Sequence, residues 1–560
     1  MSSDDDIGHL KPKYIPGFIW FILKKFGQLS VAKAISLSFA LAIFFGSIVL
    51  FVSENFLPGN PEHRHLDYID SLYLSASAFC VTGLATTPIS KFNMLSQIAL
   101  MIYIQLGGLG IIVFTMLIGL MVIKQLSRNT KLNEFISEVL DADIPVKKEG
   151  ALNPKYDSMI ESPKTTRLII AIFNISIVIE LIGALMLYLT MPNDIPKVVQ
   201  SREFLSLFTS VSAFNNAGFS LSDDLGFLTH DTDSLYTVVI LIILGGIGFP
   251  VIIFIEKLFL KVIKRFSARI EIWGETYLMT SAIRGEEPSK FYELMTNITA
   301  WAEHRVGAFN NALLGESNIV QTRIILIGSS ILLFVGLAGI FCLEYNNPKT
   351  LEGLSFLDKI ANSFLISAAA RTAGFNTFDL AGLYDPSKFL LCLLMFIGGG
   401  PQGTAGGIKI TTFVIICQYL INVISSQRVV TLFGNTISKR SVAMSIRLYI
   451  LSTIFLGIAI FLLTIFHSPE YIQCQIPCSN PKIYQSSIDK IIFEVVSAFG
   501  TVGFSLGITP NLNVVEKIIY TIIMFTGRIG IFTLLIALTG NISGTSKIGE
   551  TDDGIKIQVG

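Results

Sequence analysis

One pattern recurs four times along this chain: a long apolar stretch, a shorter apolar stretch, a loop centred on glycine, and a second long apolar stretch. Aligned on their glycines, the four loops read CVTGL (residues 80–84), NNAGF (215–219), RTAGF (371–375) and GTVGF (500–504). A succession that returns in the same order at matching places marks a repeated structural unit. We therefore expect four similar units in one polypeptide.

The long apolar stretches indicate a membrane. Residues 31–53 and 323–343, for example, reach the roughly 20 residues that a helix needs to cross the hydrocarbon core. Of the 560 residues, 51% are hydrophobic and 15% are charged, compared with about 25% charged residues in soluble domains. Positive and negative charges balance, so there is no indication of a nucleic-acid partner. The sequence predicts an all-α membrane protein in which four pseudo-symmetric span, pore-helix, loop and span units, with eight full transmembrane spans, surround one central pore.

Basic residues predict the orientation. Lys and Arg concentrate in the N-terminal segment, in the connections between units and in the C-terminal tail, and such segments stay in the cytoplasm. Both termini are therefore expected to be cytoplasmic, and the glycine loops enter from outside. The predicted division is a cytoplasmic or interfacial segment at 1–30, units at 31–124, 166–260, 322–425 and 444–540, cytoplasmic segments at 125–165, 261–321 and 426–443, and a cytoplasmic tail at 541–560.

The centres of the glycine loops are uncharged, which suits ion coordination by the main chain. A cation that sheds its water needs several oxygen ligands at once, and rings of backbone carbonyls supply them. Glycine adopts the angles that turn successive carbonyls toward one axis, and a short helix that ends at each loop directs its negative end there. Calcium prefers carboxylates, so a large monovalent ion fits better. The predicted ion filter consists of Val81, Thr82, Gly83, Asn216, Ala217, Gly218, Thr372, Ala373, Gly374, Thr501, Val502 and Gly503.

The third unit contains a further run of small residues at 398–407, GGGPQGTAGG, where a transmembrane helix should continue. Such backbone is tolerated at that depth only where it is buried in protein or lines a wet cavity. Close helix packing explains the matching glycine pairs at 107–108 and 245–246, but the third run has more glycine than packing requires. The fourth unit has Arg528 in the matching motif, and a cation at the bilayer centre costs at least ~2.5 kcal/mol and needs partners. Carbonyl oxygens of residues 398–407 are the expected partners.

With VTGL, NAGF, RTAGF and GTVGF in four matching units, the chain resembles the Trk/Ktr/HKT superfamily of potassium transporters over about residues 30–540, and its layout is most similar to the KtrB branch. The resemblance implies potassium uptake across the plasma (inner) membrane of a bacterium. It also implies a homodimer in membrane lipid that stands on a cytosolic ring of RCK-type nucleotide-binding subunits, so that any nucleotide belongs to the partner and this chain carries no organic cofactor. In the family, serine at the first filter glycine accompanies sodium permeation, and Gly83 therefore favours potassium. The transported K⁺ would be held at Gly83, Gly218, Gly374 and Gly503.

The resemblance implies a gate as well, because the family uses the arginine that matches Arg528 beside an intramembrane loop that gates the pore. Lys409 either contacts this loop or extends to the cytoplasmic surface. The predicted gating residues are Gly398, Gly399, Gly400, Pro401, Gln402, Gly403, Gly406, Gly407, Lys409 and Arg528.

Other residues with open interpretations lie outside these two sets. Arg371 precedes a filter loop, and since a cation in the ion path would repel potassium, we expect it behind the loop, against a carboxylate such as Glu494. Glu180 either binds a coupling ion or makes a hydrogen bond between helices. Cys474 and Cys478 lie in a polar outside loop and form either a disulfide or two free thiols.

Two rival functions are a cation symporter coupled to sodium or protons and a sodium-permeable cation channel. A secondary transporter typically has broken helices in corresponding spans of two halves, whereas here four glycine loops recur and one span is heavily broken. The long segment 261–321 either docks the cytosolic partner or is an insertion. No enzyme is expected, since GTAGGIKI lacks the Gly-Lys-Ser/Thr ending of a phosphate-binding loop.

Overall fold

The computed structural model describes most of the four predicted units. The regular secondary structure of its described residues is helical, apart from a short hairpin of β1 (Thr431–Leu432) and β2 (Asn435–Thr436). The predicted cytoplasmic or interfacial segment at 1–30, most of the segments 125–165 and 261–321, and Cys474 and Cys478 lie outside the described residues. The described residues are 31–56, 66–108, 163–192, 196, 201–222, 224–252, 254–255, 316–427, 429–467, 488–539 and 555–559.

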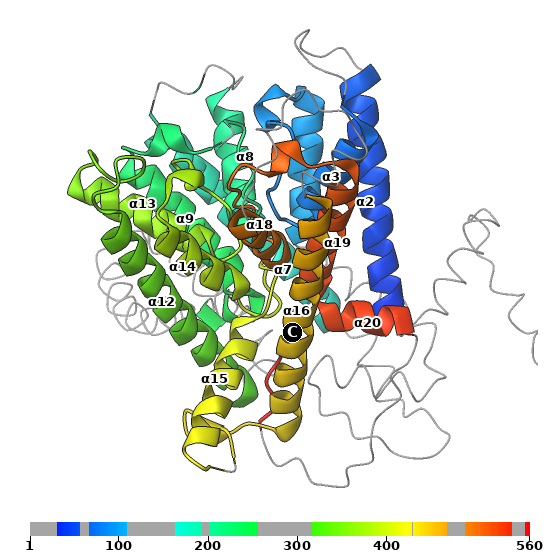
Figure 1. Ribbon diagram of the computed structural model, residues 1–560, viewed down its shortest axis with the longest axis vertical. Helices are drawn as coiled ribbons and strands as arrows, with labels where there is room; N and C mark the ends of the chain where they lie inside the picture. The colour runs from blue at the N-terminus through cyan, green and yellow to red at the C-terminus, as the bar shows by residue number, and fades with distance from the viewer. Residues whose placement is uncertain are drawn as a thin grey trace, which may run out of the picture.

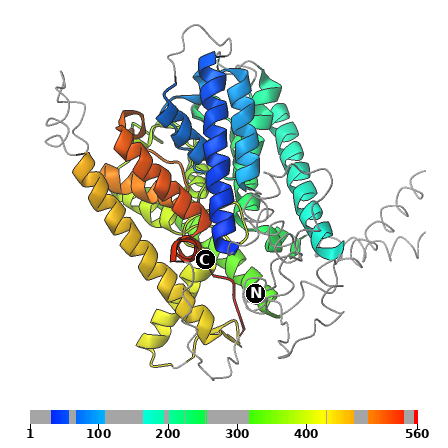
Figure 2. The same ribbon diagram turned by 90° about the vertical axis from the view of Figure 1, so that its right-hand side faces the viewer.

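Four long helices open the four predicted units: α2 (Val31–Phe56), α7 (Pro163–Thr190), α12 (Glu316–Glu344) and α16 (Lys439–Phe466). Each contains an apolar stretch long enough to cross a membrane. Large apolar side chains such as Phe45, Phe334 and Phe461 are exposed on them, as expected for faces that contact lipid. The chain is therefore an integral membrane protein. Figures 1 and 2 show α2 running along the long axis of the molecule, and Figure 2 shows α16 inclined to it.

Each long helix is followed by a short one that packs against it: α3 (Tyr68–Phe79), α8 (Arg202–Phe214), α13 (Phe356–Ala369) and α18 (Ile488–Gly500). Serine caps start two of them, since the hydroxyl of Ser201 accepts from the backbone N–H of Phe204 and that of Ser355 from Asp358. All four are too short to cross a bilayer. The short helices end at the glycine loops, and the chain then passes through a 3₁₀ turn in each unit: η2 (Ile89–Lys91), η3 (Gly226–Leu228), η4 (Leu380–Gly382) and η6 (Thr509–Asn511).

The closing helices of the units are less continuous than the sequence suggests. The closing span of the second predicted unit (166–260) is interrupted, because α9 (Thr232–Gly246) ends before Gly248, whose φ of +89° cannot continue a right-handed helix. Close packing alone therefore does not explain this glycine motif. The closing helix of the third unit is divided into α14 (Asp385–Phe396) and α15 (Ile410–Ile424), as the run of small residues predicts.

The closing span of the fourth predicted unit (444–540) is not one continuous helix either, so the prediction of a continuous span is wrong there too. Gly530, again with φ +89°, ends α19 (Val514–Ile529), and α20 (Ile531–Thr539) departs at 102°. Figures 1 and 2 show α20 lying across the end of α2, against which it packs. The described part of the chain thus holds four spans, or five if the bent pair counts as one, and the total of eight stays a prediction.

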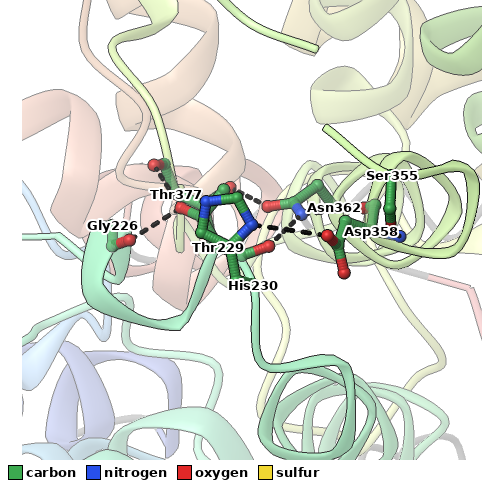
Figure 3. Close-up of polar contacts among 7 residues, drawn as sticks. All are labelled: Gly226, Thr229, His230, Ser355, Asp358, Asn362 and Thr377. Atoms are coloured by element: carbon green, nitrogen blue, oxygen red, sulfur yellow. Dashed lines mark hydrogen bonds and ion pairs between the residues drawn. The ribbon is translucent and has the colours of Figure 1, made fainter. Parts of the chain in front are cut away.

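A polar cluster ties the second unit to the third near the ends of their glycine loops (Figure 3). The side-chain amide of Asn362, on α13, donates to the carbonyl of Thr229 at 2.9 Å and accepts from the hydroxyl of Thr377. The imidazole of His230 lies 3.4 Å from the carboxylate of Asp358. The contacts of Thr229 and His230 connect the segment after the second loop to the short helix before the third, so neighbouring units hold each other in place.

Candidate functional site

The four glycine loops meet at one place. A β-carbon on Gly83 would lie 3.2 Å from the Cα of Gly218, and one on Gly218 would lie 3.1 Å from the Cα of Gly374. The corresponding distances are 3.2 Å from Gly374 to Gly503 and 3.2 Å from Gly503 back to Gly83. Segments far apart in sequence thus close a ring in chain order. We call it the glycine ring; it consists of Gly83, Gly218, Gly374 and Gly503.

All four loops make the same turn. The ring glycines have φ angles of +92°, +69°, +67° and +97°, a left-handed region that glycine adopts without strain. A backbone hydrogen bond from Thr82 to Ser77 (2.7 Å) holds the first turn on its short helix, and Ala217 donates to Ser212 (2.7 Å) in the second. Two residues before each ring glycine, a residue with a side chain is left-handed as well: Val81 (58°), Asn216 (59°), Thr372 (81°) and Thr501 (50°).

Each ring glycine faces a main-chain carbonyl of the next loop. A β-carbon on Gly218 would lie 2.6 Å from the carbonyl oxygen of Ala373, so a side chain at this point would displace backbone. The other three carbonyls, at least as close to their glycines, belong to Thr82, Ala217 and Val502. The ring therefore gathers main-chain oxygen from four loops around uncharged residues. Because a short helix ends at each loop, the partial negative charge of four helix C-termini adds to that of the carbonyls, and the site suits a cation.

The predicted gating residues lie beside this ring. We call residues 398–407 the glycine break. Its residues 399–403 pack on the end of α9 and the interruption after it, where a β-carbon on Gly403 would lie 3.1 Å from the Cα of Gly248. Its second half reaches the fourth loop, where a β-carbon on Gly406 would lie 3.1 Å from the Cβ of Thr501. The break therefore lies between the second and fourth units, in contact with a predicted filter residue.

Neighbouring segments satisfy the main chain of the glycine break. The backbone N–H of Gly400 donates to the carbonyl of Gly246 at 2.8 Å, and that of Gly407 donates to Gly527 at 3.2 Å. Most residues of the break are buried. The unwound stretch is thus enclosed by protein, which is the condition for irregular backbone at membrane depth.

Arg528 is 6% exposed at the end of α19 and donates to three carbonyls. One guanidinium nitrogen donates to the carbonyl of Thr404 in the glycine break. The other donates to Gly107 at 2.5 Å and Gly108 at 3.3 Å, the last described residues of the helix that begins at Met94; hydrogen bonds from a charged guanidinium to carbonyl oxygens are stronger than neutral ones. The expected contact between Arg528 and the break is present, and it also connects the break to the first unit.

Two side-chain contacts hold the break from the other side. The ammonium of Lys409 donates to the carbonyl of Ala405 at 2.5 Å. Lys409 therefore contacts the loop, which is the first of the two interpretations given for it. The side-chain amide of Gln402 donates to that of Gln558 at 2.9 Å. Gln558 belongs to the C-terminal segment 555–559, whose main chain also accepts from the hydroxyl of Thr411 at 2.8 Å. The end of the chain therefore contacts the break directly.

The suggested pairing of Arg371 with Glu494 is wrong. Glu494 accepts from its own loop instead, from the hydroxyl of Ser505 at 2.5 Å, the backbone N–H of Ile508 at 3.0 Å and the hydroxyl of Thr509 at 3.0 Å. These three donors satisfy the carboxyl group and stiffen the segment after the fourth filter loop. Arg371 does lie behind its loop, as expected, but its bonds go to carbonyl oxygens.

Glu180 takes part in a hydrogen bond between helices. Its carboxyl oxygen accepts from the side-chain amide of Asn215 at 2.9 Å, and the same amide donates to Gln105 at 2.8 Å. This network connects α7, the end of α8 and the helix Met94–Gly108 behind the second loop. Of the two interpretations of Glu180, the structure thus shows the hydrogen bond between helices, and Asn215 is the partner of the carboxyl group.

Sequence reasoning missed two residues of the site. Thr404 accepts from Arg528 through its carbonyl, and its hydroxyl lies 3.2 Å from the side-chain amide of the filter residue Asn216. The signal for it was a single hydroxyl residue inside the glycine run. Gln558 carried no signal, because nothing in the sequence indicates that the end of the chain returns to residues 398–407.

A comparison with protein families finds a match over most of the chain. A family model described as a cation transport protein, TrkH, matches residues 46–280 and 313–543. The two matched stretches omit residues 281–312, which fall within the cytoplasmic segment predicted at 261–321.

Curated relatives match over nearly their whole length. The chain is 30% identical over 514 residues to the Ktr system potassium uptake protein B of Bacillus subtilis (strain 168), with 91% of this chain and 93% of that protein covered. It is 28% identical over 516 residues to the potassium/sodium uptake protein NtpJ of Enterococcus hirae, with 91% and 93% covered. The crystal structure of the potassium transporter TrkH from Vibrio parahaemolyticus shares the fold with a TM-score of 0.56 at 15% identity, over 95% of this chain and 86% of that one.

Proposed function

This chain belongs to the TrkH family of cation transport proteins and is similar to its KtrB-like members, and from that premise we propose that it takes up potassium through the glycine ring. The single observation that carries the proposal is the ring itself, in which four loops place main-chain carbonyl oxygen so near to each other's glycines that no β-carbon would fit. Carbonyl oxygens in such a ring replace the water shell of an ion without any side-chain charge. The transported K⁺ is the substrate.

The proposed architecture follows from the ring. Four units of span, short helix, glycine loop and closing span surround one pore, and eight spans in total cross the plasma membrane with both termini in the cytoplasm. The short helices enter from outside and stop halfway, so that their carbonyl ends meet at the ring. The four short helices, each packed on the long helix before it, support this arrangement.

The glycine break is the proposed gate. It lies against Thr501 of the fourth loop, and Thr404 within it reaches Asn216 of the second. A backbone stretch in this place blocks the route away from the ring, and its main chain is held by hydrogen bonds rather than by a continuous helix. Arg528 acts as the latch, because its bond to Thr404 lasts only while the break stays in place.

The names of the relatives support a system with more than one component, and one of them names sodium as well as potassium. The Bacillus relative is named as protein B of a Ktr system, which suggests a further component; we propose a cytosolic RCK-type ring beneath a homodimer of this chain. The Enterococcus relative is named as a potassium/sodium uptake protein. A sodium-permeable channel and a symporter coupled to sodium or protons are therefore the alternatives that a test must separate.

The first experiment is growth at low potassium of cells that lack their own uptake systems, with this chain expressed alone or with a cytosolic subunit. Growth rescue is expected, and its absence under both conditions with protein present in the membrane contradicts potassium uptake. Flux into liposomes that contain the purified protein then separates the alternatives. A channel-like protein shows potassium flux that is insensitive to sodium and proton gradients at fixed voltage.

The filter itself is tested by Gly83→Ser. The side chain would displace the carbonyl of Ala217, so the ring must open, and we expect sodium permeation to rise. The matched control is Gly353→Ser, because Gly353 has a similar φ of +85° but no atom within contact distance of a β-carbon. Both variants carry the same backbone strain, and only the first alters the ring. An unchanged ion preference in Gly83→Ser contradicts the filter.

A further inference from the structure

The third loop differs from the other three in one charged residue. The residue that precedes the left-handed position is Cys80 in the first loop, Asn215 in the second and Gly500 in the fourth, but Arg371 in the third. The third unit is also the one whose closing helix contains the glycine break. A buried cation and an extended break in the backbone therefore occur together in a single unit.

Arg371 connects that loop to the break. Its side chain is 7% exposed, and one guanidinium nitrogen donates to the carbonyl of Gly398 at 3.1 Å. The other donates to the carbonyl of Ser329, on α12, at 3.3 Å. Among the described residues no carboxylate pairs with it. Arg371 thus joins the third filter loop, the first long helix of its unit and the first residue of the glycine break.

The carbonyl of Gly398 needs this donor. In a continuous helix it would accept from the N–H four residues later, but α14 ends at Phe396. The N–H of Gly398 turns to Ile408 at 2.8 Å, and the next carbonyl, of Gly399, accepts from Ile410 at 3.0 Å. Among the described backbone bonds none reaches the carbonyl of Gly398. A buried carbonyl without a partner is costly, and Arg371 removes that cost.

Packing alone does not hold this end of the break. Arg371 lines a small cavity together with Ser329, Gly399 and Gly246. The Nε of Arg371 and the hydroxyl of Ser329 have no hydrogen-bond partner among the described atoms. Where packing is incomplete, the position of a segment depends more on its specific hydrogen bonds. At the other end, Arg528 holds Thr404 in the same way.

We propose that Arg371 is a positioning residue of the gate, which anchors the first residue of the glycine break while Arg528 latches Thr404. This inference rests on the proposed gating role of the break. A break held at both ends stays in its blocking position, whereas a break released at either end leaves it more often. Arg371 does not bind the transported ion, so its removal acts on gating and leaves ion preference intact.

The test compares Arg371→Gln, Arg528→Ala and the double variant in liposomes without a cytosolic subunit. Ser329→Ala is the matched control, because it removes the unpaired hydroxyl from the same cavity and keeps the carbonyl that Arg371 contacts. We expect potassium flux to rise about tenfold in Arg371→Gln, as for the loss of one hydrogen bond to a charged group. The potassium to sodium ratio should stay unchanged, and the double variant should exceed the single ones by less than the product of their effects.

Amide hydrogen exchange followed by mass spectrometry supplies a second readout on Arg371→Lys, which keeps the charge and is the milder change. Peptides covering residues 396–408 should exchange faster than in the unaltered protein, while those covering 372–376 should not. This measurement stands if Arg371→Gln does not fold.

The outcomes separate the two proposals. If Arg528→Ala raises flux and Arg371→Gln does not, the anchor is wrong and the gate stands. An altered potassium to sodium ratio at unchanged flux would show that Arg371 serves the filter instead, and multiplicative effects would show two unconnected contacts. If neither variant raises flux, both proposals are wrong: the glycine break is not the gate, and Arg371 does not anchor it.

Discussion

Arg528→Ala tests the gate most directly. The substitution removes the bond to Thr404 in the glycine break and the two bonds to Gly107 and Gly108. Only the first joins the arginine to the moving segment, so it alone enters the difference between blocked and open states. A hydrogen bond to a charged group contributes about 1.5–3 kcal/mol, which corresponds to an increase of about 10- to 150-fold in the open population.

The assay is potassium or rubidium flux into liposomes that contain the purified variant without a cytosolic subunit. Flux should rise toward that range until the open pore itself limits it. Arg528→Lys should give a smaller rise, since an ammonium presents a point charge and cannot serve both groups of carbonyls in the fixed geometry of a guanidinium. Arg447→Ala is the control, because Arg447 lies exposed on α16 and its loss should change nothing.

The result that refutes the reasoning is flux in Arg528→Ala at or below the level of the unaltered protein, with the variant monodisperse and thermally stable in detergent. Stability must be measured, because the carbonyls of Gly107 and Gly108 lose their donor too. A variant that is unstable and inactive would show that Arg528 holds the units together and does not latch the break.

Three further substitutions test other parts of the site. Glu494→Gln keeps the size of the side chain but weakens its three bonds to the fourth loop. We expect the free energy of unfolding to fall by about 1–3 kcal/mol, which a lower melting temperature would show, together with a reduced preference for potassium. An unchanged melting temperature contradicts this expectation. Lys409→Met removes the bond to Ala405 within the break and should raise flux less than Arg528→Ala does; a larger rise would make Lys409 the main latch. Glu180→Gln keeps the bond from Asn215, so flux measured with and without sodium and proton gradients should match that of the unaltered protein. Any difference in the dependence on these gradients would identify Glu180 as a coupling site.

Several features of the site followed from local sequence. The sequence predicted the glycine of each loop, the short apolar helix before it and the long run of small residues at 398–407. It could do so because glycine, which has no side chain, adopts backbone angles that other residues avoid. Arg528 was readable for a different reason, since a cation in an apolar stretch must have a partner. The nearest unpaired oxygens in a membrane protein are those of a broken helix.

Other features depended on how segments far apart in sequence are placed. Gly248 and Gly530 interrupt stretches that are largely apolar, and a single glycine with positive φ does not change their hydropathy. Arg371 was expected to find a carboxylate, because charge pairing is the usual solution for a buried cation. The nearby carbonyl of Gly398 decided otherwise.

From sequence alone, this protein was determined to be a membrane protein built from four similar units with uncharged, glycine-centred loops, because length, apolar character and glycine act locally. The tertiary structure decided that the four glycines touch in one closed ring and that two arginines hold a single break from opposite ends. Most of these contacts join different units of the chain, and they depend on the packing of all the helices together.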